Sequence, residues 1–175
     1  MGASALIETE RLLLRKPRVA DAADLAVAYS DPEVMRFIGD GSTASLAEIE
    51  DEIRQWLERW ESWGMSLYSL ERREDRRVLG CAGFLLWDPE TWQVPGDETE
   101  LGWLLAREHW GHGYAAEAAF ALRDWAFGER GLSRVISLIQ PENLRSIRVA
   151  EKLGERYERD VEVRGMPARL YSLER

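Results

Sequence analysis

The chain has 175 residues, 45% of them apolar and 31% charged, which predicts one globular domain over 1–175 and excludes extended disorder. A net charge of −9 disfavours a nucleic-acid surface and favours cationic partners such as amines. No apolar run reaches membrane-spanning length and no signal-peptide pattern is present, so we expect no membrane association and a cytoplasmic location. The single cysteine, Cys81, excludes an intrachain disulfide and is expected to be buried.

The first half of the chain is predicted to combine three strands with two helices. In chain order we expect an edge strand at 6–16, a helix from Asp21 to about Tyr29, a short segment at 33–38, a helix at 45–63, strands at 65–70 and 78–87, and a loop at 88–97. In the edge strand, Leu12 and Leu14 alternate against Arg15, and Asp21 is a candidate cap for the first helix. Ser45 and Glu48 form a capping-box pattern for the second helix.

The second half continues with a central strand, two helices and three shorter strands. We expect a strand ending at 103–105, a helix from about Ala115, a strand at 135–139, a helix from Asn143 to Leu153, and an antiparallel pair at 161–163 and 168–173 that turns near Gly165. The order β-α-α-β-β-β-α-β-α-β-β predicts an α/β (α+β) domain. Its twisted sheet is mixed but mostly antiparallel, with about six or seven strands and about four helices.

Two glycines stand between the central strand and the helix that follows it. Gly111 and Gly113 allow positive φ angles and place no Cβ in front of a ligand. The helix that begins after them leaves several backbone N–H groups free at the positive end of its dipole. This arrangement predicts an anion site, and phosphate is the usual anion at such a site.

The residues around the glycines narrow the class of phosphate loop. A P-loop is excluded because no Gly-Lys-Ser or Gly-Lys-Thr follows, and a dinucleotide loop because Ala116 stands where its third glycine would be. The segment 110–115, Trp-Gly-His-Gly-Tyr-Ala, resembles the acetyl-coenzyme A pyrophosphate loop of the GNAT N-acetyltransferases, Gln/Arg-x-x-Gly-x-Gly/Ala. Trp110 replaces the usual Gln or Arg, and the continuation through Glu117 is similar to the RimJ/RimL branch, which acetylates ribosomal-protein N-termini.

A second segment supports the resemblance. Asn143 and Gly154 are good caps for the helix between them whatever the function. The segment is also similar to the family's Asn-x-x-Ser-x-x-x-x-Glu-Lys-x-Gly-Phe, in which the Asn contacts the pantetheine arm. Glu155 departs from the usual Phe, and Ala150 replaces a tyrosine thought to protonate the leaving thiolate. In the RimJ/RimL branch the serine at the position of Ser146 is the suggested replacement for that tyrosine.

The resemblance implies acetyl-coenzyme A as cofactor and acetyl-group donor. The residues it places at the cofactor are Trp103, Leu104, Leu105, Trp110, Gly111, His112, Gly113, Tyr114, Ala115, Asn143 and Ser146. A backbone N–H near Leu104 or Leu105 would stabilise the developing oxyanion. We expect no metal: His109 and His112 lie in a turn without a third ligand of suitable type.

Glu100 is the preferred general base. Attack on a thioester requires a neutral amine, so a proton must be accepted, and Glu100 precedes Leu-Gly-Trp as the family's glutamate precedes its Gly-Tyr or Gly-Trp. Burial beside the cofactor would raise its pKa toward neutrality. Glu98 lies on the same face of the strand and is the alternative base.

The activity implied is direct transfer of acetyl from acetyl-coenzyme A to a primary amine in a ternary complex. The resemblance favours a protein N-terminus, and a small amine such as a polyamine, amino acid or aminoglycoside is the alternative. A non-catalytic acyl-coenzyme A-binding module remains a rival, because the usual tyrosine is missing.

Trp87 and Trp92 are candidates for the acceptor pocket, although core packing is preferred for the tryptophans. The oligomeric state stays open, with a homodimer as one option.

Overall fold

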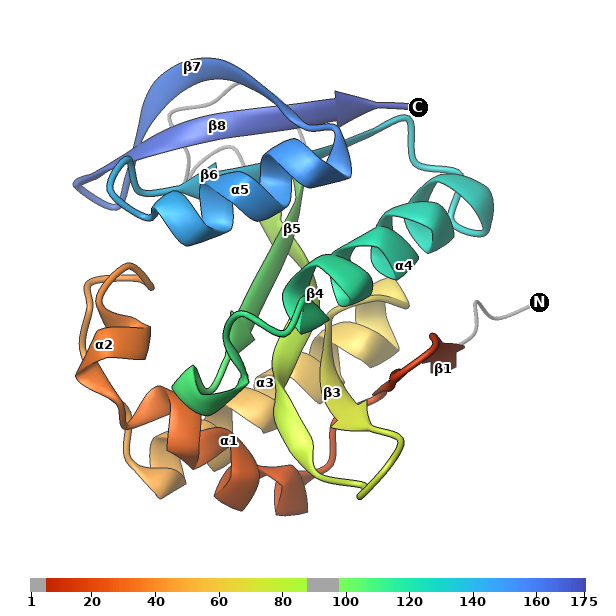
Figure 1. Ribbon diagram of the computed structural model, residues 1–175, viewed down its shortest axis with the longest axis vertical. Coiled ribbons are helices and arrows are strands. Elements are labelled where there is room, and N and C mark those ends of the chain that lie inside the picture. The colour runs from red at the N-terminus through yellow and green to blue at the C-terminus, as the bar shows by residue number, and fades with distance from the viewer. Residues whose placement is uncertain (1–5, 88–97) are drawn as a thin grey trace.

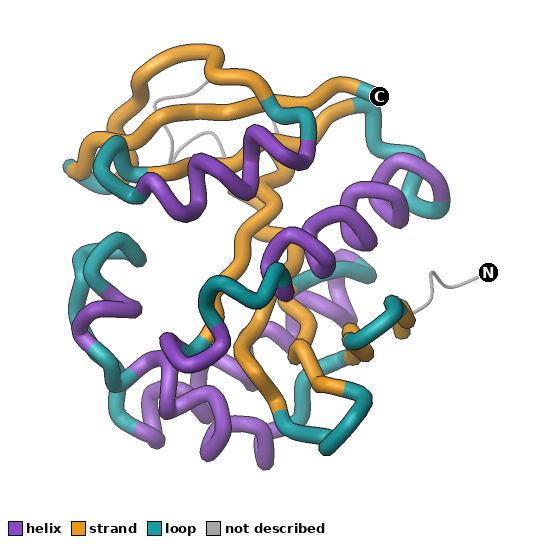
Figure 2. Tube along the Cα trace, viewed as in Figure 1, coloured by secondary structure: helices purple, strands orange, loops and turns teal. Residues whose placement is uncertain are grey.

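The computed structural model describes residues 6–87 and 98–175 as one mixed sheet with helices on both faces (Figures 1 and 2). The described residues form eight strands, in the order β1-β2-β3-β4-β5-β6-β8-β7. The strands are β1 (Leu6–Glu8), β2 (Leu12–Arg15), β3 (Leu67–Arg72), β4 (Val78–Trp87), β5 (Glu98–Leu105), β6 (Arg134–Ile139), β7 (Arg156–Val163) and β8 (Met166–Glu174). The helices are α1 (Ala22–Tyr29), α2 (Pro32–Met35), α3 (Leu46–Trp63), α4 (Tyr114–Gly128) and α5 (Leu144–Leu153), with 3-10 turns η1 (Val19–Asp21) and η2 (Arg107–His109).

The predicted fold class and order of elements are confirmed, with slightly more elements than expected. The described residues contain eight strands and five α-helices rather than six or seven and about four. The extra strand arises because 6–16 folds as two antiparallel strands around a turn, and the extra helix is the single turn α2. The loop expected at 88–97 lies outside the described residues.

Helices cover both faces of the sheet, because side chains alternate from face to face along each strand. Cys81 on β4 and Leu104 on β5 pack with α1 and α3. The next residues along, Ala82 and Leu105, face the opposite way and pack with α4. Cys81 is buried, as the sequence predicted. The two hydrophobic layers hold the strands that carry the site rigidly between them.

Helix α3 follows its sequence signals closely. The Ser45 hydroxyl accepts a hydrogen bond from the Glu48 N–H, and the Glu48 carboxylate accepts one from the Ser45 N–H, which is the predicted capping box. Gly64 ends the helix in the left-handed conformation with φ of 69°. One apolar face of the helix, which includes Ile53 and Trp56, is buried against the sheet.

One expectation near the N-terminus was wrong. Asp21 precedes α1 but makes no side-chain cap; its carboxylate instead binds the Arg15 guanidinium at 2.8 Å and the Ser69 hydroxyl at 2.6 Å. Arg15 itself is only 8% exposed. Its guanidinium therefore meets the Asp21 carboxylate in a buried position.

Strands β5 and β6 share one ladder position in the part of the chain that the structure describes. They run parallel with Glu100 opposite Ile136, and they separate toward their carboxyl ends (Figure 1). In contrast, β4 and β5 pair antiparallel from Trp87 opposite Glu98 to Gly80 opposite Leu105. The gap between β5 and β6 therefore opens directly beyond the pair formed by Glu100 and Ile136.

Candidate active site

The predicted anion loop has the backbone geometry that its glycines suggested. Gly111 and Gly113 have φ angles of 80° and 83°, in the left-handed region. Gly113 is the N-cap of α4 and supplies no capping side chain, so the N–H groups of Tyr114 and Ala115 begin the helix without intrahelical partners. The result is a 15-residue helix whose positive end faces open space.

A contact from the first hairpin holds the beginning of α4 from behind. Arg11 donates through Nη1 to the His112 carbonyl at 2.9 Å, and its guanidinium binds the Glu117 carboxylate at 2.6 Å. The Thr9 hydroxyl also donates to Glu117, at 2.6 Å. Burial opposes ionisation of Glu117, but these hydrogen bonds and the positive charge of Arg11 outweigh it and lower its pKa. Glu117 therefore fixes the loop and does not face the anion site.

A cavity of about 270 Å³ lies in front of the α4 N-terminus. Its lining residues come from the glycine loop, the end of β5 and one face of α5: Trp103, Leu105, His109, Trp110, Gly111, Gly113, Tyr114, Ala115, Ala116, Arg145, Ser146, Arg148, Val149 and Lys152. Among these described lining residues, Arg145, Arg148 and Lys152 are cationic and none is acidic. Free N–H groups and three cations suit a group that carries several phosphates.

Trp110, at the loop position where the family usually has Gln or Arg, makes two contacts that shape the anion cavity. Its indole N–H donates to the Leu105 carbonyl at 3.0 Å, which fixes the ring. The guanidinium carbon of Arg145 lies 4.1 Å from the centre of that ring. The loop thus holds a cation supplied by α5 rather than one of its own. His112, in contrast, does not line any of the three cavities described, although its carbonyl is held by Arg11.

Helix α5 joins this cavity to the gap between β5 and β6. Asn143 is its N-cap, and its side-chain oxygen accepts a hydrogen bond from the Ser146 N–H at 3.2 Å. Ser146 and Trp103 line the anion cavity, a neighbouring cavity of about 510 Å³ and the cavity that contains Glu100. One continuous groove therefore runs from the α4 N-terminus, past Ser146, to Glu100.

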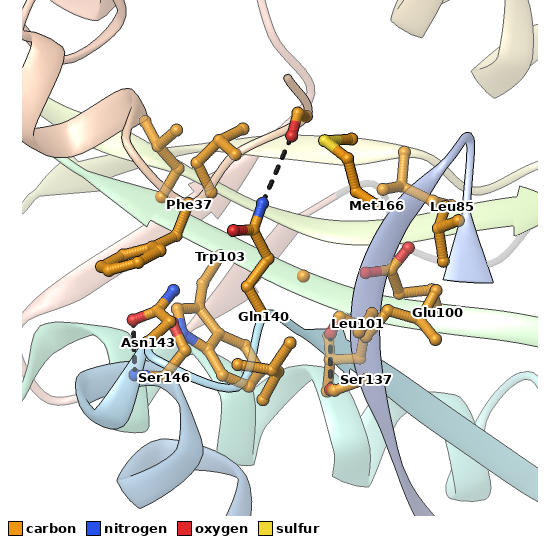
Figure 3. A pocket seen from close by; sticks show the side chains of 18 of the residues that line it. Phe37, Leu85, Glu100, Leu101, Trp103, Ser137, Gln140, Asn143, Ser146 and Met166 are labelled. Carbon is orange, nitrogen blue, oxygen red and sulfur yellow. Dashed lines mark hydrogen bonds between the residues drawn. The ribbon is translucent and has the colours of Figure 1, made fainter. Parts of the chain in front are cut away.

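The far end of the groove is a cavity of about 290 Å³ in the sheet gap, shown in Figure 3. Glu100 projects into it from β5, while Phe37, Leu85 and Met166 contribute apolar walls. The Gln140 amide donates to the Gly39 carbonyl at 3.3 Å, which bridges the loop after α2 and the end of β6. Glu100 and Arg164 are the only charged residues among its described lining residues.

Glu100 has the environment expected of a base that works near neutral pH. It is 8% exposed, and burial raises its pKa to about 7. The Trp87 indole N–H donates to its carboxylate at 2.6 Å, and the Leu138 N–H donates to it from the separated part of β6. Both bonds favour the ionised form and limit the rise. No cation is paired with this carboxylate among the described residues, unlike Asp21.

The other predicted site residues are placed less centrally. The Glu98 carboxylate binds Arg134 at 3.2 Å and does not line the Glu100 cavity. Trp87 lines that cavity and also packs against the buried cluster of Ile136 and Leu170, whereas Trp92 lies outside the described residues. Burial lowers the pKa of His109, and no cluster of potential metal ligands occurs within 6–87 and 98–175.

Sequence reasoning missed the residues that come to the groove from distant elements. Those that line the groove are Phe37, Arg145, Arg148, Lys152 and Arg164, and Arg11 holds the glycine loop from behind without lining it. Arg145, Arg148 and Lys152 recur at helix spacing on the second motif, so their shared face was detectable in the sequence. Phe37 and Arg164 gave no local signal, because only the tertiary fold brings them to the cavity. No helix in the described chain is long and apolar enough to cross a membrane.

Comparison with known proteins agrees with this geometry. Residues 11–156 match the model of the acetyltransferase (GNAT) domain. Uncharacterised protein YkkB of Bacillus subtilis is 33% identical, over 98% of this chain and 96% of its own. Uncharacterised N-acetyltransferase p20 of Bacillus licheniformis is 32% identical, over 83% of this chain and 79% of its own. RimL, a ribosomal L7/L12 α-N-protein acetyltransferase solved with coenzyme A, has a TM-score of 0.80 over 97% of each chain but only 14% identity, so it shows the fold alone.

The chain belongs to the GNAT acetyltransferase family. It is an enzyme that takes its acetyl group from acetyl-coenzyme A. The free N–H groups of α4 and the three cations of the anion cavity fit the phosphates of that donor.

Proposed function

We propose that this enzyme acetylates a primary amine that enters the Glu100 cavity, with Glu100 as general base and a protein N-terminus as the acceptor. The observation that carries the proposal is one buried carboxylate with a pKa of about 7, at the end of a groove that begins at an anion site. A base with that pKa is about half ionised at neutral pH, so it can both accept and release a proton there.

Each of the proposed site residues has a separate role in the reaction. Glu100 accepts a proton from the ammonium group, directly or through one water, and the neutral nitrogen attacks the thioester carbonyl carbon. The carbon–sulfur bond then breaks, and the sulfur leaves with the electron pair. Ser146 lies in the groove between the anion site and Glu100, where its hydroxyl can donate a proton or a hydrogen bond to that sulfur. The backbone N–H groups at Leu104 and Leu105 are our candidates for the oxyanion donor.

The cavity walls favour an acceptor with one positive charge and an uncharged body. Apart from Glu100 and Arg164, its described lining is apolar or uncharged. A polyamine or an aminoglycoside carries several ammonium groups, each of which would lose water without gaining a carboxylate partner here. A peptide N-terminus places one amine beside one side chain, which agrees with the reaction of RimL, an α-N-protein acetyltransferase of the same fold.

Arg164 supports one alternative acceptor. Its guanidinium carbon lies 5.4 Å from the centre of the Trp87 ring, and Trp87 in turn binds Glu100. A small amine that also carries a carboxylate could therefore meet Glu100 at one end and Arg164 at the other. A free amino acid or a dipeptide has this charge pattern, whereas the interior of a long peptide chain does not.

A panel of acceptors distinguishes these cases by release of free thiol from acetyl-coenzyme A. It contains peptides with apolar N-terminal residues, the same peptides with blocked N-termini, free amino acids and polyamines. Turnover of open but not blocked peptides supports the proposal. Turnover of amino acids alone, lost in Arg164→Ala, supports the alternative. Coenzyme A binding without turnover of any amine would contradict both.

Gly113→Ala tests the donor end separately. The substitution adds a Cβ at a φ of 83°, which only glycine adopts easily. Coenzyme A affinity measured by calorimetry should fall about tenfold, roughly 1.4 kcal/mol. Gly165→Ala is the matched control, because it has a similar φ of 81° in a turn far from the loop in sequence. Unchanged affinity in a folded Gly113→Ala variant would argue against the anion site.

A further inference from the structure

A second buried glutamate, Glu155, lies close to the gap between β5 and β6, and the reaction described above does not use it. It follows the C-cap of α5 and is 3% exposed. Its Oε1 lies 3.0 Å from the Ser137 hydroxyl, and its Oε2 has no hydrogen-bond partner among the described residues. An ionised carboxylate in that position would leave a charged oxygen buried and unbonded, which is costly.

The Ser137 hydroxyl has two neighbours that can each accept its proton. It lies 2.8 Å from the Leu101 carbonyl oxygen and 3.0 Å from Glu155. A hydroxyl carries one proton, and a carbonyl can only accept. Both contacts are satisfied together only if Glu155 is protonated, donates to the Ser137 oxygen, and leaves the Ser137 proton for Leu101. Burial raises the pKa of Glu155 to about 8, against the opposing effect of the Ser137 hydrogen bond and with a weaker contribution from the charge of Glu100, and this favours the neutral acid.

The hydrogen bond from the Ser137 hydroxyl to the Leu101 carbonyl takes the place of a backbone ladder hydrogen bond at the point where β5 and β6 separate. β5 and β6 pair at Glu100 and Ile136, and Ser137 and Leu101 are the next residues along each strand. One residue further along β6, the Leu138 N–H donates to the Glu100 carboxylate. Two side chains, Ser137 and Glu100, therefore satisfy backbone groups that strand separation leaves free.

We propose that Ser137 and Glu155 are positioning residues for the base. Glu155, as a neutral acid, donates to Ser137, and Ser137 donates to Leu101 and so holds β5 against β6 beside Glu100. When Glu155 ionises, its carboxylate competes for the Ser137 proton, the Leu101 carbonyl loses its donor, and Glu100 is held less firmly. This inference rests on the proposed role of Glu100 as base.

The charges around Glu155 do not remove the competition. The charged or titratable groups on the elements packed near it are Glu100 on β5, Arg123 on α4, Glu151 and Lys152 on α5, Arg134 on β6, Arg156 and Tyr157 on β7, and Tyr171 on β8. Arg123 binds Asp124 and the Leu153 carbonyl, and Arg134 binds three other carboxylates. Glu151, Lys152 and Arg156 are exposed. Glu100 is the group whose charge acts on Glu155, and it favours the neutral form.

The first test is independent of catalysis. Carboxyl carbons of 13C-labelled glutamate are followed by NMR from pH 4 to pH 10, and the Glu155 signal is assigned by its loss in Glu155→Gln. We expect its transition near pH 8. A transition near the ordinary glutamate value, about 4.3, would overturn the proposal. This result stands whether or not Glu100 proves to be the base, which Glu100→Gln tests by turnover.

The second test follows kcat against pH in folded variants. The wild type should lose activity as Glu155 ionises above about pH 8, and Glu155→Gln, which keeps a neutral donor, should not. Glu151→Gln on the exposed face of α5 is the matched control and should keep the wild-type profile. Identical alkaline profiles for the wild type and Glu155→Gln would overturn the proposal.

The third test addresses Ser137 directly. Ser137→Ala should lower kcat about tenfold with little change in the KM for acetyl-coenzyme A, because a small misplacement of the base slows the chemical step. Ser137→Thr keeps the hydroxyl and should restore most of kcat. Equal kcat in the Ala variant and the wild type would overturn the positioning role. If Ser137→Ala does not fold, the pH profile of Glu155→Gln decides the question.

Discussion

Two clusters of buried carboxylates lie in the same sheet, and they differ in whether a cation is present. In the first, Arg15 binds Asp21 at 2.8 Å and Glu71 at 2.6 Å, and Arg76 also binds Glu71 at 2.6 Å. In the second, Glu100 and Glu155 have no ion pair within the described chain. The first cluster is near η1 and β3, and the second borders the groove.

The pKa of Asp21 moves in the opposite direction from the pKa values of Glu100 and Glu155. Burial opposes ionisation of Asp21, but hydrogen bonds from Arg15, Ser69 and the Arg18 N–H outweigh it and lower the Asp21 pKa. Burial of Glu100 and Glu155 is not compensated in this way, and it raises their pKa values to about 7 and about 8. Similar burial thus keeps Asp21 ionised where Arg15 is present and gives a pair that titrates near neutrality where no cation is present, and only the latter suits proton transfer.

The largest expected effect comes from removing the cation of the first cluster. Arg15→Met leaves Asp21 and Glu71 buried without their shared partner, which should lower the free energy of unfolding by about 3 to 5 kcal/mol. Urea denaturation at pH 7 measures the change. The loss should shrink near pH 3, because protonated carboxyl groups need no cation. A variant as stable as the wild type at pH 7 would contradict the role given to Arg15.

In contrast to Arg15→Met, Glu100→Gln should affect turnover more than stability. Turnover should fall about tenfold to a thousandfold, because the amide accepts no proton, while acetyl-coenzyme A affinity stays nearly unchanged. The decline of kcat below about pH 7 should disappear, because that limb reports protonation of Glu100. Glu98→Gln removes only an ion pair to Arg134 and is the control. If Glu98→Gln loses turnover and Glu100→Gln does not, the base lies two residues earlier on the same strand.

Stability should also change with pH in opposite directions for the two clusters. The folded state holds protons on Glu100 and Glu155 that the unfolded chain releases near its ordinary pKa, so their contribution to stability falls as pH rises from about 4 to about 8. Asp21 contributes stability above its ordinary pKa and loses it as pH falls through its lowered value. Calorimetry should show Glu100→Gln combined with Glu155→Gln melting about 5 °C above the wild type at pH 9. An equal or lower melting temperature would contradict the uncompensated burial.

The smallest expected effects distinguish two serines that contact these acids. Ser69 donates to the ionised Asp21 at 2.6 Å, so Ser69→Ala should cost about 2 kcal/mol of unfolding free energy at pH 7. Ser137 meets a neutral Glu155, so Ser137→Ala should cost about 1 kcal/mol. Parallel urea titrations measure both. The reverse order would indicate that Glu155, rather than Asp21, is the more strongly charged acceptor.

The parts that the sequence predicted well are those whose causes are local. Gly111 and Gly113 permit the left-handed turn by themselves, and Ser45 with Glu48 caps α3 through contacts three residues apart. The geometry at Glu100 agrees with its assignment as a base, although its role stays a proposal. Alternation and resemblance were enough to place Glu100 on the central strand at a family position.

The parts that were wrong or missed depend on contacts between distant segments. Asp21 has the residue type of a helix cap, but Arg15 and Ser69 offer its carboxylate stronger buried partners. The pairing of Glu155 with Ser137 depends on how the end of α5 meets β6, which a one-dimensional pattern does not specify. Arg164 reaches the cavity because the turn between β7 and β8 brings it there.

The clamp between Arg11 and Glu117 links the first hairpin to the donor site thermodynamically. Arg11 binds the His112 carbonyl and Glu117 and so helps to order the glycine loop, which favours donor binding. Thermodynamic linkage requires that donor binding stabilise these Arg11 contacts by the same free energy. Acetyl-coenzyme A should therefore slow amide hydrogen exchange at β1 and β2, although neither strand lines the groove. A fusion partner or purification tag that disturbs the turn at 9–11 would, by the same coupling, weaken donor affinity from outside the active site.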